Sequence, residues 1–279
     1  MMTNENKLET AKLVILFWAE LAIELLLGFI FGRLENAGIV IPTYLHVFIL
    51  DICLLIPVFA YTIKKGDSIV EAFEFKKIKV STFFFTILLV IVAQPMVMLA
   101  NVVSQFFVPN VMVQAVDQFA TESVGLTLLA TVISAPITEE IVCRGFFTNR
   151  LKKVFPFAVA AIFSGLMFGI IHLNLNQFCY ATVLGIIFAY VNRASGSIFT
   201  SIEMHMVFNG TNMCLLFMMN AVMEAAGMDF AKVAEQSRAA SSTLPTTAIV
   251  LAILSIPSFF LVRLVIRAIA KREGNLETK

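Results

Sequence analysis

Two adjacent glutamates and an arginine stand inside a stretch of the chain that is otherwise apolar. Glu139, Glu140 and Arg144 lie within residues 124–147, where most other side chains are hydrophobic. Ionisable groups in a membrane-length segment are costly to bury, so they mark functional sites by default. A carboxylate in such a place can act as a general base or acid towards a bound water. The segments that hold and face this cluster therefore decide what chemistry it can do.

Helical spacing divides the cluster into two parts. Residues four apart share a helix face, so Glu140 and Arg144 are placed to form an ion pair. Glu139 lies about 100° further around the helix and remains as the unpaired carboxylate. Pro136 removes a backbone donor and is expected to kink the helix or start it, which would let water collect near the carboxylates. A purely structural network of these charged side chains is the alternative.

Two histidines and an asparagine are the best candidates to face the carboxylates. His172 ends one apolar stretch, and His205 and Asn209 share a helix face early in a later stretch. A single membrane histidine is more often a helix–helix contact, but the repeated polar partner favours a site. Counting about 1.5 Å per residue places Glu139, His205 and Asn209 at similar depths, with His172 about 10 Å nearer the outer face.

The composition predicts an all-α polytopic membrane protein. Of 279 residues, 59% are hydrophobic and 14% are charged, whereas soluble domains carry about 25% charged residues. The net charge of +1 gives no indication of nucleic-acid binding. About 20 apolar residues cross a bilayer as a helix. On that criterion we expect eight spans, at approximately 12–32, 42–63, 80–103, 123–148, 155–173, 177–193, 197–222 and 246–269.

Basic residues predict which way these spans run. The loops expected on the opposite side from the termini hold only Arg33, Lys232 and Arg238, and the other basic flanking residues lie on the side of the termini. The positive-inside rule then places both termini in the cytoplasm. We expect a multi-pass protein of a cell membrane, and the compact chain without a targeting extension suggests a prokaryotic one. The first apolar run is too long, and too acidic, for a signal peptide.

The chain is expected to form a single transmembrane domain over residues 1–279. Its motif-bearing core covers about 64–222, followed by an outer loop at about 224–245 and a last helix at about 246–269. Residues 66–79 mix lysines with aromatic and aliphatic side chains, which suits a segment lying on the inner membrane surface.

Other polar residues in the spans are not assigned to the chemistry. Glu20 and Glu24 share a face of the first span and Asp51 lies in the second. Such carboxylates can line a water path. The cysteine spacing matches no zinc or redox motif, so we expect buried free thiols at Cys53, Cys143, Cys179 and Cys214.

The ordered motifs resemble those of a known family. They are Glu139-Glu140-x-x-x-Arg144, Phe168-x-x-x-His172 and His205-x-x-x-Asn209, on the fourth, fifth and seventh of the expected helices. This series is similar to that of the CAAX protease and bacteriocin-processing (CPBP, or Abi) family, which includes the Ras-converting CAAX endopeptidases. The resemblance covers roughly residues 64–215 and is most specific over 134–209.

The resemblance implies an intramembrane endopeptidase acting on a CAAX-like or bacteriocin-related peptide at the membrane. It assigns water activation to Glu139 and His172, and stabilisation of the oxyanion to His205 and Asn209. Glu140 and Arg144 become supporting residues. Helical spacing alone also leaves Glu139 as the free carboxylate.

Several alternatives stay open. We expect no cofactor, but two histidines and a glutamate are also a zinc ligand set, although the sequence lacks H-E-x-x-H. Cys143, beside Arg144, is a weaker candidate nucleophile. A transporter or channel could use the buried carboxylates as a proton path. A non-catalytic scaffold or bacteriocin-immunity protein could bind a peptide in the same place. The identity of the substrate and the oligomeric state are not readable from the residues.

Overall fold

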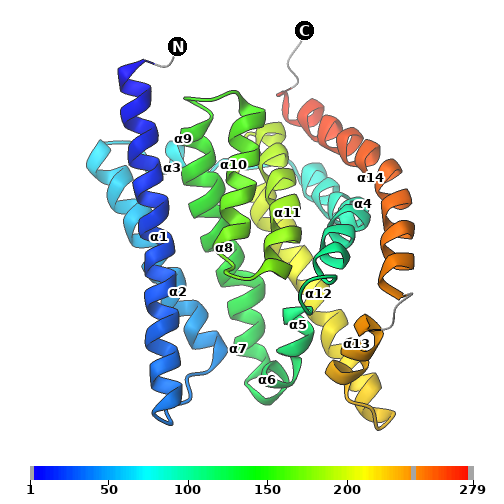
Figure 1. The fold of residues 1–279 in the computed structure, drawn as a ribbon. Helices are drawn as coiled ribbons and strands as arrows, with labels where there is room; N and C mark the ends of the chain where they lie inside the picture. The colour runs from blue at the N-terminus through cyan, green and yellow to red at the C-terminus, as the bar shows by residue number, and fades with distance from the viewer. Residues whose placement is uncertain (1–2, 240–242, 276–279) are drawn as a thin grey trace.

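The described part of the protein is entirely helical. The computed structural model describes residues 3–239 and 243–275, and no strand occurs there (Figure 1). This confirms the all-α prediction. The helices are α1 (Asn4–Asn36), α2 (Thr43–Lys65), α3 (Ile69–Ala72), α4 (Val80–Ser104), α5 (Val111–Gln114), α6 (Val116–Thr121), α7 (Val124–Leu128), η1 (Leu129–Ser134), α8 (Ala135–Glu140), η2 (Ile141–Thr148), α9 (Asn149–Leu151), α10 (Phe157–Ile170), α11 (Leu175–Ser195), α12 (Phe199–Ala225), α13 (Phe230–Ala239) and α14 (Thr243–Glu273).

One of the eight expected spans is shorter than predicted. Among the described residues, seven helical segments are long and apolar enough to cross a membrane. The eighth, α10, has 14 residues, which is about 21 Å against a hydrocarbon core of about 30 Å. It ends early because Leu173 takes a left-handed φ of 54° and Asn174 caps α11 by accepting from the backbone N–H of Gln177. The expected span 155–173 is therefore wrong in length, and the chain turns back inside the bundle.

The segment that carries the glutamates is a continuous helix with two changes of winding. Residues 124–151 run through α7, η1, α8, η2 and α9, of which η1 and η2 are π-helical. Pro136 begins the α-helical turn that follows η1. π-Helical stretches are rare in proteins, and those that occur are often found at functional sites. The helical turn that bears Glu139 and Glu140 thus lies between two such stretches.

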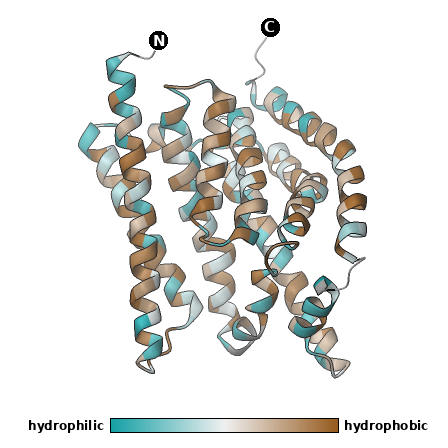
Figure 2. Ribbon diagram, viewed as in Figure 1, coloured by the Kyte–Doolittle hydropathy of each residue, from teal (hydrophilic) through white to brown (hydrophobic). Residues whose placement is uncertain are grey.

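The helices form one bundle with both described ends of the chain on the same side (Figure 1). That arrangement agrees with an even number of passes. Apolar residues cover most of the long helices, and hydrophilic residues gather towards their ends (Figure 2). Helix α11 packs against α10, α4, α12 and α14, and α4 and α14 lie side by side. The segments with the candidate residues are held around α11.

The segment at 66–79 is anchored in one end of the bundle by Phe73. Phe73 is completely buried, with its ring centroid 5.2 Å from that of Phe59 and 6.5 Å from that of Phe146. The backbone N–H of Ile198 donates to the carbonyl of Glu74 at 3.1 Å. The expected inner-surface segment thereby closes one end of the core.

The region predicted as an outer loop contains a short helix, α13. Residues 240–242 of that loop, together with 1–2 and 276–279, lie outside the described residues.

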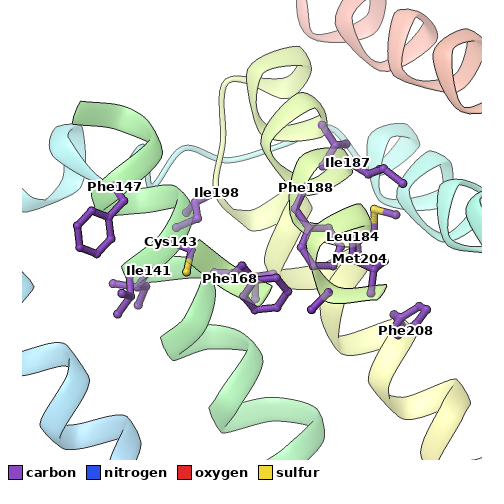
Figure 3. Packing of buried hydrophobic residues seen from close by; sticks show 14 of the residues in the cluster. Ile141, Cys143, Phe147, Phe168, Leu184, Ile187, Phe188, Ile198, Met204 and Phe208 are labelled. Carbon is purple, nitrogen blue, oxygen red and sulfur yellow. The ribbon is translucent and has the colours of Figure 1, made fainter. Parts of the chain in front are cut away.

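Glycines allow the close approach of the central helices. A Cβ added at Gly185 of α11 would lie 2.8 Å from the Cα of Gly165 in α10 and 2.6 Å from Nη2 of Arg144. Real Cβ atoms do not occupy such positions, so α10, α11 and η2 could not keep this spacing with a larger residue. Figure 3 shows the buried apolar side chains that fill the rest of this region.

We predict that Gly185→Ala destabilises the protein. Overpacking a filled core costs about 1–3 kcal/mol, so the midpoint of thermal unfolding in detergent should fall. Gly28→Ala in α1 is the matched control, because a Cβ there would meet nothing within 4 Å, and alanine is preferred in a helix by about 1 kcal/mol. Equal midpoints for the two variants would contradict the packing described for Gly185.

Candidate active site

The four residues predicted to carry the chemistry line one cavity. Glu139 of α8, His172 in the turn after α10, and His205 and Asn209 of α12 all border a space of about 560 Å³. His172 reaches this cavity although its expected depth was different. His172 lies in the turn between α10 and α11, and this turn borders the cavity.

The structure confirms the division of the glutamates. Nη1 of Arg144 lies 2.7 Å from Oε1 of Glu140, and both side chains are almost completely buried. The side chain of Glu139 is 21% exposed and faces the cavity. Glu140 therefore carries the ion pair and Glu139 is the carboxylate that a substrate or water can reach.

His205 bridges the two glutamates. Its Nδ1 lies 3.2 Å from Oε1 of Glu140, and its Nε2 lies 3.6 Å from Oε2 of Glu139. Oε1 of Glu140 already accepts from Nη1 of Arg144, and as a carboxylate oxygen it accepts here too, so Nδ1 of His205 donates to it. The second contact is longer than a direct hydrogen bond. Nε2 of His205 is thus the atom that points towards the free carboxylate.

His172 is held in one tautomer by the backbone. Its Nδ1 lies 2.7 Å from the carbonyl oxygen of Phe168. A carbonyl only accepts, so Nδ1 carries the proton and Nε2 of the neutral ring keeps a lone pair. His172 can therefore accept a proton at Nε2 in the cavity.

A single phenylalanine contacts three groups of the site. The ring of Phe168 meets His172 edge-on with centroids 4.9 Å apart, and His205 edge-on at 5.5 Å. The guanidinium carbon of Arg144 lies 4.2 Å from the same ring centroid, a cation–π distance. Sequence reasoning quoted Phe168 only as the first residue of a motif. Its position four residues before His172, on the same helix face, was the signal for this role.

Asn209 connects α12 to the first π-helical segment. Its Nδ2 donates to the carbonyl of Thr131 in η1 at 2.9 Å. A carboxamide nitrogen carries two protons, so one N–H of Asn209 remains for a ligand in the cavity.

The hydrogen bonds of Asp51 to the segment that carries Glu139 were not predicted from the sequence. Asp51 is 5% exposed, accepts a hydrogen bond from Oγ of Ser134 and is also hydrogen-bonded to Thr138. Both partners lie in the segment that carries Glu139, so Asp51 ties α2 to that segment. The contact joins distant parts of the chain, and no local pattern could have indicated it. Glu20, which is 1% exposed, does not border the cavity.

Cys143 does not border the cavity either. It is 2% exposed and lies among buried apolar side chains, as Figure 3 shows. A nucleophilic role for this thiol therefore has no access to a substrate in the cavity.

The side chains do not fit a zinc site as they stand. Within the described ranges, no group of three or more His, Cys, Asp or Glu side chains is arranged to hold a metal ion. A catalytic zinc takes three protein ligands. Both histidines have an anchored Nδ1, as zinc ligands often do, but among the described residues no third side chain completes such a group with them.

Comparison with known proteins identifies the segment that contains the site. Residues 121–211 match the family model described as Type II CAAX prenyl endopeptidase Rce1-like. The resemblance to this family is confirmed. The matched segment, one part of the chain, contains all the motif residues from Glu139 to Asn209.

A second protein is similar to this chain over part of its length. YdiL of Bacillus subtilis (strain 168), a protein named provisionally as a membrane peptidase, is 30% identical over 88 residues. That stretch covers 32% of this chain and 36% of YdiL, so the likeness concerns about a third of each protein. No solved structure matches the chain.

The two glutamates should differ sharply in their contribution to stability. Glu140→Gln leaves the guanidinium of Arg144 buried without its counter-charge, and breaking a buried pair costs about 3–5 kcal/mol. Glu139→Gln is the matched control, because it removes the same charge from a carboxylate without an ion pair to arginine. Thermal unfolding in one detergent compares them, and a Glu140→Gln protein as stable as Glu139→Gln would contradict this assignment.

Proposed function

We propose that this protein is an intramembrane endopeptidase of the CAAX type that hydrolyses a peptide bond with an activated water. The observation that carries the proposal is the convergence of Glu139, His172, His205 and Asn209 on one cavity, from three parts of the chain. The family match over 121–211 supports the same reaction class.

Water activation falls to Glu139 and His172. The bilayer excludes water, so a protease there must hold and polarise one. Glu139 is the accessible carboxylate, and Nε2 of His172 has a lone pair because Nδ1 donates to Phe168. Either group can take the proton of water as the hydroxyl attacks the peptide carbonyl, and can later return it to the leaving amine. Such general base and acid catalysis contributes about 10²–10⁴-fold.

Stabilisation of the oxyanion falls to His205 and Asn209. Asn209 borders the cavity and has a second amide N–H beyond the one that donates to Thr131. His205 donates from Nε2 when both ring nitrogens carry protons, since Nδ1 already donates to Glu140. Its Nε2 lies 3.6 Å from Glu139, so a proton taken from water at Glu139 has a short path to this ring. Two such donors would stabilise the developing negative charge.

The substrate in this proposal is a CAAX-like or bacteriocin-related peptide at the membrane. The protein itself is a multi-pass component of a cell membrane with both termini in the cytoplasm. The basic flanking residues support that orientation.

Removing the catalytic groups should abolish cleavage while the protein remains folded. We expect Glu139→Gln and His172→Ala to eliminate proteolysis, and Asn209→Ala to lower it by about 10²–10³-fold, as for one oxyanion donor. The membrane and secreted peptidomes of cells with the wild-type protein and with Glu139→Gln would be compared. Glu35→Gln, at the exposed end of α1, is the control. Identical peptidomes, or a phenotype that survives Glu139→Gln, would point instead to a scaffold or immunity role.

The metal-free reaction is tested separately. We expect purified protein to contain no stoichiometric zinc and to keep its activity in a chelator. Elemental analysis and cleavage assays on the same sample decide the point. Stoichiometric zinc, with loss of cleavage on its removal, would establish a zinc-dependent enzyme in its place.

A further inference from the structure

The cavity extends from the candidate site towards one end of the bundle. Beyond the four candidate residues, its wall includes side chains from the start of α2, the loop before α5, α6 and α13. Figure 1 shows α5, α6 and α13 at the end of the bundle opposite to both described chain ends. The lining residues at that end are Thr43, Asn110, Phe119 and Phe230.

The exposed part of the wall lies towards that same end. Met98 of α4 is 47% exposed, and Leu215 and Met219 of α12 are 49% and 39% exposed. Fourteen residues separate His205 from Met219, which is about 21 Å along the helix. The cavity is therefore deepest at the candidate site and open between the distal halves of α4 and α12.

The chemistry of the wall selects what can occupy it. Glu139 is its one acidic side chain, and no lysine or arginine is among its described residues. A carboxamide both donates and accepts, so the amides can pair with the N–H and C=O groups of a peptide backbone. A charged side chain or a terminal carboxylate would lose its hydration without a partner. The amide residues are Gln94, Asn101, Asn110, Gln177, Asn209 and Asn212.

The basic residues distinguish the two ends of the bundle. The opening lies at the end where the flanking segments carry Arg33, Lys232 and Arg238. Lys232 and Arg238 are paired there with Asp229 and Glu235. The end with both termini carries many more cations, at Lys7, Lys12, Lys64, Lys65, Lys76, Lys77, Lys79, Lys152, Lys153, Arg193, Arg267, Lys271 and Arg272. Cytoplasmic loops hold the excess of lysine and arginine, so the opening faces away from the cytoplasm.

We infer that this site takes its substrate from the non-cytoplasmic side of the membrane, as an uncharged apolar segment within a longer peptide, through the opening between α4 and α12. The inference rests on the proposed function for the cleavage step. It differs from processing of a cytoplasmic C-terminus, because the opening is on the other side and the wall offers no cation for a terminal carboxylate.

Single cysteines report the side of the opening directly. Asn212→Cys is placed in the exposed wall of the cavity, Asn36→Cys marks the same end of the bundle, and Lys77→Cys marks the opposite end; all three positions are exposed. The background carries serine at the accessible native cysteines, Cys53, Cys179 and Cys214, while Cys143 is buried. Intact cells and permeabilised cells are treated with a small membrane-impermeant methanethiosulfonate reagent.

We expect Asn212→Cys and Asn36→Cys to be modified in intact cells, and Lys77→Cys only after permeabilisation. Labelling of Asn212→Cys only after permeabilisation would overturn the inference, and so would its failure to react under either condition. Labelling does not depend on catalysis, so a wrong result here leaves the protease assignment untouched. Conversely, cleavage that survives Glu139→Gln would remove the protease assignment and leave the labelling result standing. If cleavage is established, modification of Asn212→Cys should lower it at least tenfold.

Discussion

A buried ion pair is the constraint around which the centre of this bundle is arranged. Glu140 and Arg144 have almost no solvent contact, and an unpaired charge in that position would be very costly. The guanidinium lies over Phe168 of α10 and 5.1 Å from the ring centroid of Phe188 in α11. It also occupies the space left by the missing side chain of Gly185. The pair thus sets the relative positions of α8, α10 and α11 through contacts that tolerate little change.

The same ion pair also orients a side chain of the cavity, His205. Glu140, held by Arg144, accepts from Nδ1 of His205, and the other ring nitrogen then points towards Glu139. The buried Glu140–Arg144 pair thereby orients Nε2 of His205 at the cavity. The charged residues of the motif thus differ in their contacts. Glu140 and Arg144 form the buried ion pair, and Glu139 faces the cavity next to the histidine that Glu140 orients.

The sequence predicted the local part of this arrangement and missed the part that depends on tertiary contacts. The pairing of Glu140 with Arg144 follows from helical spacing, and the helical class follows from the length of the apolar runs. The position of His172 at the cavity did not follow, because it depends on how α10 and α11 pack within the bundle. The contact of Asp51 with Ser134 joins two helices whose registers no local pattern sets. The burial of Phe73 was missed for the same reason.

The π-helical segments on either side of α8 have a consequence for how the chain can vary. Each residue advances an α-helix by about 100°, and a π-helical turn accommodates one residue more than an α-helical hydrogen-bond register would. Shortening η1 by one residue would rotate Glu139 and Glu140 out of phase with the lipid-facing positions before them, although every charged residue of the motif would still be present. The spacing between the motif and the preceding apolar positions therefore carries information of its own. In this protein the direction in which Glu139 points depends partly on the number of residues in η1.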